Sequence, residues 1–66
     1  MELAVGKEFE RLPEILRARD VANYLDIGLG KAYGLMRTNE IKSFRAGRCL
    51  RTTKKSLRDF IDERVA

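Results

Sequence analysis

The side chains best suited to chemistry in this chain are basic, and they gather in its middle. Residues 27–55 hold eight lysines and arginines against one carboxylate, Glu40, which gives this stretch a net charge of +7. The residues before it carry −2 and those after it −1, so the chain reaches +4 at pH 7. Lysine and arginine donate charge-assisted hydrogen bonds to phosphate oxygens. The pattern therefore favours a phosphate-binding surface over its plain alternative, a solvated basic face without a partner.

Residues for other kinds of chemistry are scarce. The chain has no histidine and a single cysteine, Cys49, so we expect neither an internal disulfide nor a zinc site. It has no glycine-rich phosphate loop, and a chain of 66 residues has little room for a catalytic pocket. We therefore expect no enzymatic activity, no cofactor and no metal ion.

Length and hydropathy indicate one small cytoplasmic domain. Sixty-six residues can bury one hydrophobic core and not two. No apolar run approaches the roughly 18 residues of a membrane span. The first ten residues carry three glutamates and one lysine, which is unlike a secretory signal. These features predict a cytoplasmic, nucleoid-associated protein that does not contact membranes.

The periodicity of apolar residues predicts the elements that hold the basic side chains. Residues 1–11 lack a period and are expected to form a flexible arm, with order beginning near Leu12 in a domain over 12–66. A short extended segment over 14–16 precedes two helices, over 19–26 and about 29–38. Their apolar residues, at spacings of i, i+3 and i+4, are Val21, Tyr24, Leu25, Ala32, Leu35 and Met36. Two short helices joined by a turn with glycine are typical of a helix-turn-helix.

A hairpin is expected after the second helix. Its strands are predicted over 41–45 and 49–52, with a glycine-containing loop of three residues at 46–48. This loop length sets Phe44 opposite Leu50, so that both cover the core. The opposite face then carries Arg45, Cys49 and Arg51.

A last helix over 54–65 is predicted to close the core. Its apolar positions recur on one side, and Thr52 and Thr53 precede it as candidate N-terminal caps. The apolar positions are Leu57, Phe60, Ile61 and Val65.

Four stretches, in this order, resemble the excisionase and MerR-like helix-turn-helix domains. Residues 20–25 (DVANYL) are similar to the family's E-V-A-E-Y-L, and residues 32–37 (AYGLMR) to V-Y-R-L-I-R. Residues 44–48 (FRAGR) are similar to F-R-V-G-R, and residues 57–61 (LRDFI) to L-D-A-W-L. The resemblance implies an α+β winged helix-turn-helix, in the order short strand, helix, helix, two-stranded wing and helix. It also implies that the second helix enters the major groove of DNA and that the wing contacts the neighbouring minor groove or backbone.

The chain departs from the family pattern at several positions. Gly28 and Gly30 stand where small hydroxyl residues usually cap the second helix, so that helix should begin less firmly. Gly34 replaces a long basic side chain, which removes one contact but lets the backbone come closer to DNA. Thr52 and Thr53 replace the usual Ile-Pro, which affects how the chain enters the last helix.

Eight residues are the candidate DNA contacts, and each has an alternative interpretation that involves no DNA. Lys31 could be merely solvated, although the start of a recognition helix is where base edges are met. Tyr33 could pack at the edge of the core, and Arg37 could pair with Glu40. The wing arginines could serve solubility alone. The full set is Lys31, Tyr33, Gly34, Arg37, Lys42, Arg45, Arg48 and Arg51.

The favoured function is an excisionase-type factor that binds double-stranded DNA and helps direct site-specific recombination, with an integrase as a candidate partner. MerR-type relatives continue into a dimerising helix and an effector domain, whereas this sequence ends at Ala66. Two alternatives stay open: a small transcriptional regulator, and a protein-interaction module whose basic face meets an acidic partner. Because the predicted core uses every apolar stripe, we expect a monomer in free solution that can bind adjacent DNA sites cooperatively.

Overall fold

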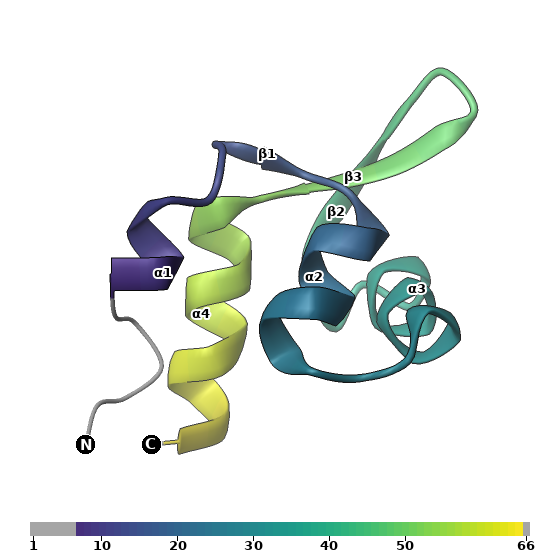
Figure 1. The fold of residues 1–66 in the computed structure, drawn as a ribbon. Helices are drawn as coiled ribbons and strands as arrows, with labels where there is room; N and C mark the ends of the chain where they lie inside the picture. Colours follow the sequence, from purple (N-terminus) through teal and green to yellow (C-terminus); the bar gives the residue numbers. More distant parts are fainter. Residues whose placement is uncertain (1–6, 66) are drawn as a thin grey trace.

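A three-stranded antiparallel sheet of order β1-β3-β2 connects the helices of the fold (Figure 1). The computed structural model describes residues 7–65. The predicted winged helix-turn-helix order of short strand, helix, helix, two-stranded wing and helix is confirmed, with one helical turn added in front. The elements are α1 (Lys7–Glu10), β1 (Ile15–Leu16), α2 (Ala18–Leu25), α3 (Leu29–Arg37), β2 (Ser43–Ala46), β3 (Cys49–Thr53) and α4 (Lys54–Val65).

The turn between α2 and α3 is tight because Asp26 adopts a left-handed conformation, with φ 57° and ψ 49°. This conformation ends many helices, and aspartate tolerates it better than most residues. The next amide, of Ile27, donates to the carbonyl of Ala22 at 3.0 Å and closes the end of α2. Gly28 then starts α3 from an extended conformation and offers no side-chain cap, as the sequence predicts.

The core lies between the helices and the sheet, and the inner members of each predicted stripe form it. Leu16, Val21, Ala32, Met36, Ile41, Leu57 and Ile61 are all buried. Tyr24, Leu25, Leu35 and Phe60 are partly buried against them. Val65 is 68% exposed, so the prediction that it belongs to the core is wrong. It is the last residue of α4.

Residues just before the predicted start of order are folded. Phe9 in α1 is only 4% exposed, and its ring packs edge-on against Tyr24 with 5.5 Å between ring centroids. The Nζ of Lys54 lies 5.6 Å from the same ring and donates to the carbonyl of Glu10 at 2.9 Å. The expectation that order begins near Leu12 is therefore wrong, because an aromatic ring earlier in the chain finds a place on the core. The part of the expected arm at residues 1–6 lies outside the described residues.

The hairpin is one residue tighter than predicted. β2 and β3 pair with Ala46 opposite Cys49 and Arg45 opposite Leu50, which leaves a two-residue turn at Gly47 and Arg48. Gly47 has a φ of 69° and Arg48 is not in the positive-φ region, which fits a type II′ turn with glycine first. A shift of one residue sends each side chain to the other face of a strand.

The changed register exchanges the sheet faces that were predicted for Phe44 and Arg45. Phe44 lies opposite Arg51 and is 43% exposed, so the prediction that it covers the core is wrong. Arg45 takes its place on the face of Leu50, because directly opposed residues in an antiparallel pair share a face. Leu50 itself packs against the core, as predicted.

The two threonines before α4 have different roles. Thr53 is the N-terminal cap, since its Oγ1 accepts a hydrogen bond from the amide of Ser56 at 3.0 Å. Thr52 is fully buried, and its hydroxyl donates to the carbonyl of Lys42 at 2.6 Å. Only Thr53 therefore caps the helix, while Thr52 fastens β3 to the chain that leads into β2.

We predict that Phe9→Ala lowers the free energy of unfolding by about 3 kcal/mol, because it empties a buried aromatic site. Urea unfolding followed by circular dichroism measures this change. Phe44→Ala is the matched control: its ring is 43% exposed, and its loss should cost less than about 1 kcal/mol. Equal losses for the two variants would contradict the packing of α1.

Candidate nucleic-acid interface

A shallow depression of about 360 Å³ lies where the start of α2, the start of α3 and the end of the hairpin meet. Four of its nine lining residues are arginines and none is acidic. We call it the arginine groove, after Arg17, Arg19, Arg48 and Arg51. The remaining lining residues include Leu29, Tyr33 and Leu50. Positive charge beside apolar surface, without a carboxylate, suits a polyanion that also offers flat or methylated groups.

The groove belongs to the side of the molecule formed by α3 and the hairpin. Figure 1 shows the hairpin projecting well beyond the body on this side, with α1 and α4 on the other. β3 is the central strand, but β1 pairs only with its last two residues. The rest of β3 pairs with β2 alone and projects from the sheet as the hairpin, with Arg48 in its turn. A helix and an adjoining protruding hairpin can touch neighbouring parts of one DNA duplex.

Three predicted contacts line the groove together: Tyr33, Arg48 and Arg51. Tyr33 is 45% exposed, so its ring is accessible from the groove and is not simply part of the core edge. Arg51 is half-buried, and its Nη1 donates to the carbonyl of Leu50 at 3.0 Å, which holds the guanidinium against the strand. Arg48 is exposed in the turn of the hairpin.

Three more predicted contacts lie on the outer surface of α3: Lys31, Gly34 and Arg37. Lys31 and Arg37 are exposed, and neither forms an ion pair within residues 7–65 as described. The pairing of Arg37 with Glu40 that the sequence allows does not form, because Glu40 accepts from the Nη2 of Arg64 at 2.8 Å. Both α3 cations thus keep their charge available for a ligand.

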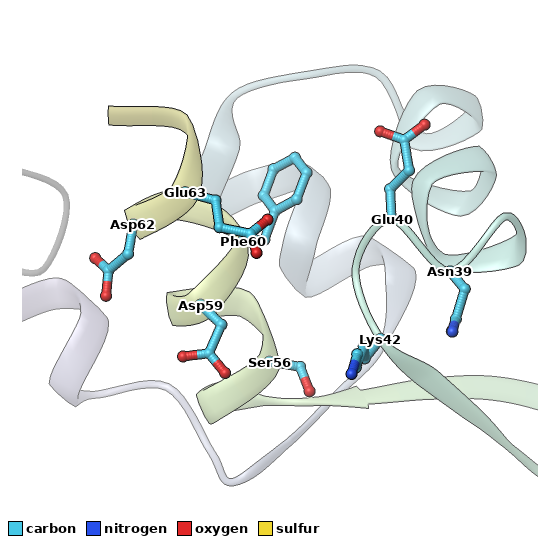
Figure 2. A pocket seen from close by; sticks show the side chains of 8 residues that line it. All are labelled: Asn39, Glu40, Lys42, Ser56, Asp59, Phe60, Asp62 and Glu63. Atoms are coloured by element: carbon cyan, nitrogen blue, oxygen red, sulfur yellow. The ribbon is translucent and has the colours of Figure 1, made fainter. Parts of the chain in front are cut away.

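Arg45 and Lys42 lie apart from the groove. Arg45 is exposed on β2 and shares a sheet face with Leu50, so it continues the basic surface along the hairpin. Lys42 lines a different depression, of about 500 Å³, between the loop after α3 and α4. Figure 2 shows this second depression with carboxylates on both sides. Its acidic members are Glu40, Asp59, Asp62 and Glu63.

Arg17 and Arg19 line the groove although the sequence did not predict them as contacts. Both lie in residues 1–26, whose net charge of −2 does not indicate a basic surface. The signal that could have found them is position, since they flank the start of the first helix of the helix-turn-helix. That helix commonly crosses the DNA backbone. The amide of Arg17 donates to Oδ2 of Asp20 at 3.0 Å, which fixes the start of α2 and leaves the guanidinium outside this contact.

The α2–α3 pair, the adjoining hairpin and the basic surface between them define a winged helix-turn-helix DNA-binding domain. The comparison with protein families agrees, because the family described as "Helix-turn-helix domain" matches residues 15–65. The chain belongs to this family of DNA-binding domains. No match was found among curated proteins or among solved structures. Within the described part of the chain, no helix is long and apolar enough to cross a membrane.

We predict that Gly34→Ala raises the free energy of unfolding by about 0.5–1 kcal/mol, since alanine is the better helix former. The backbone of Gly34 is helical, and an added Cβ would meet no neighbouring atom within 4 Å. Thermal or urea unfolding measures the change. Gly47→Ala provides the contrast, because the φ of 69° at Gly47 makes any side chain there unfavourable. A destabilised Gly34→Ala protein would contradict this description of α3.

Proposed function

We propose that this protein is an excisionase-type architectural factor, which binds specific sites on double-stranded DNA and helps a recombinase act on a mobile element. The arginine groove carries the proposal, because it joins the recognition helix α3 to the hairpin and contains no carboxylate. In this proposal α3 lies in the major groove and the hairpin on the neighbouring backbone or minor groove. The four stretches that resemble excisionase and MerR-like domains support the same arrangement.

The proposed contacts have two different tasks. Lys31, Tyr33 and Arg37 extend from α3, where the major groove presents a different hydrogen-bonding pattern for each base pair. Arg45 and Arg48 lie on the hairpin, where contacts to phosphate supply affinity and carry little sequence information. Arg17 and Arg19 would add phosphate contacts at the start of α2. Several monomers would bind adjacent sites side by side and bend the DNA between them.

The second candidate is a small transcriptional regulator of MerR-like type. The same resemblance favours it, because both families share the DNA-binding arrangement. The two functions differ in the consequence of binding: an excisionase stimulates recombination by a supplied integrase, whereas a regulator changes promoter output. Recombination of a plasmid substrate with and without the protein, beside a promoter-reporter assay, decides between them.

We predict that log affinity for DNA falls with log salt concentration at a slope of about −4 to −5. The basic surface should neutralise about five phosphates, and each contributes about −0.9 to the slope. Fluorescence anisotropy of a labelled duplex at several salt concentrations measures this dependence. A slope near zero would overturn the DNA-binding proposal in favour of an acidic protein partner.

A further prediction separates the recognition helix from the hairpin. Lys31→Ala should weaken binding to the selected site more than binding to scrambled DNA, since a good base contact contributes about 1–3 kcal/mol of discrimination. Arg48→Ala should weaken both by a similar factor and make the salt slope shallower by about one unit. Affinities for a duplex selected from a random library and for its scrambled version supply the measurement.

The matched control is Lys55→Ala. It also removes one positive charge, but Lys55 lies on α4 beside Asp59 at 3.4 Å and does not line the groove. Its effect on affinity should be small. If Arg48→Ala abolished site preference while Lys31→Ala preserved it, the tasks assigned to helix and hairpin would be reversed.

A further inference from the structure

The recognition helix exposes two large apolar side chains that lie outside the hydrophobic core. Leu29 is 55% exposed and Tyr33 is 45% exposed, although both stand on α3, whose buried residues are Ala32 and Met36. They are four residues apart and therefore lie one above the other on the helix surface. Both line the arginine groove.

The residues beside Leu29 and Tyr33 on the surface of α3 are glycines, so no neighbouring side chain covers the pair on that side. Gly30 and Gly34 follow Leu29 and Tyr33 around the helix and have no side chains, and a Cβ at either glycine would meet open space. Leu29 and Tyr33 are therefore the two side chains that project along the groove edge of the helix. An exposed apolar surface of this kind at the start of a recognition helix is open to a ligand.

The charges around the pair limit what that ligand can be. Arg17, Arg19, Arg48 and Arg51 line the same groove, with no carboxylate among the lining residues. The ligand must therefore combine a dense negative charge with apolar groups. A DNA duplex provides both, because the C5-methyl group of thymine projects into the major groove between two rows of phosphates.

We propose that Leu29 and Tyr33 contact thymine methyl groups, and that the protein prefers A·T pairs under α3 for this reason. The inference rests on the proposed binding of DNA and adds how bases are read. The apolar pair reads thymine without hydrogen bonds, which suits a helix with two glycines on its outer surface. An acidic amphipathic peptide is the competing ligand, and its binding is one outcome of the test.

The test removes the methyl groups from the DNA. The probes are four duplexes of equal length: alternating A and T, alternating A and U, alternating G and C, and alternating G and 5-methylcytosine. Each repeats one chemistry along its whole length, so the register in which the protein binds does not matter. We expect tighter binding to the A-T duplex than to the A-U duplex, by about fourfold for each methyl group buried. The methylated G-C duplex should likewise bind more tightly than the unmethylated one.

Two variants assign the effect to the helix. Leu29→Ala should remove most of the difference between the A-T and A-U duplexes, and it should stay folded because Leu29 is exposed and alanine favours helix. Val65→Ala is the matched control, since Val65 is an exposed apolar residue at the far end of α4, and it should keep the full difference. Circular dichroism checks the fold of both proteins.

The outcomes are distinct for the two proposals. Equal affinity for the A-T and A-U duplexes, or a full difference in Leu29→Ala, would overturn methyl readout and leave DNA binding intact. Failure to bind any of the four duplexes would overturn the proposed function as well. Binding to an acidic amphipathic peptide alone would identify the other class of ligand.

Discussion

The hydrogen bond from Thr52 to the carbonyl of Lys42 is the contact on which the arrangement of the domain depends. Thr52 is fully buried and lies in the central strand, opposite Leu16 of β1 on one side and Ser43 of β2 on the other. A buried hydroxyl is costly unless it is bonded, so this 2.6 Å contact strongly favours one register. The same strand runs into the hairpin at one end and directly into α4 at the other. A slip at Thr52 would therefore displace the hairpin from α3 and separate the two halves of the arginine groove.

The two depressions also differ in the charges of their lining residues, and this difference favours the side of α3 and the hairpin for a polyanion. The arginine groove has four cations and no carboxylate, whereas the depression beside α4 has four carboxylates around Lys42 (Figure 2). Three of those carboxylates are in surface ion pairs, with Lys55, Arg58 and Arg64. Solvent-exposed pairs of this type add little stability. Because these pairs largely neutralise the α4 side, the arginines of the groove dominate the field of the molecule, and a polyanion is drawn toward α3 and the hairpin.

The sequence predicts those elements of the structure whose apolar residues recur at a regular spacing. The helical stripes through Val21, Met36 and Leu57 place α2, α3 and α4 correctly, because each stripe has only one way to bury its face. The hairpin register escaped prediction, since one residue of loop length decides whether Phe44 or Arg45 faces the body. The positions of Phe9 and Arg17 were not predicted for a different reason. A single aromatic ring or a single cation forms no periodic pattern, and only the folded chain shows which residues lie beside it.

The recognition helix owes its position to packing and not to its own helical propensity. α3 has nine residues, two of them glycine, and begins without a side-chain cap. Such a segment would not remain helical alone in water. It is held by the buried contacts of Ala32 and Met36 and ends with the hydroxyl of Thr38 bonded to the carbonyl of Gly34 at 3.0 Å. Because Ala32, Leu35 and Met36 hold the helix on its core side, the residues on its outer surface are not part of the core. Residues at the positions of the two glycines, Leu29 and Tyr33 can therefore vary with little effect on the packing of the domain.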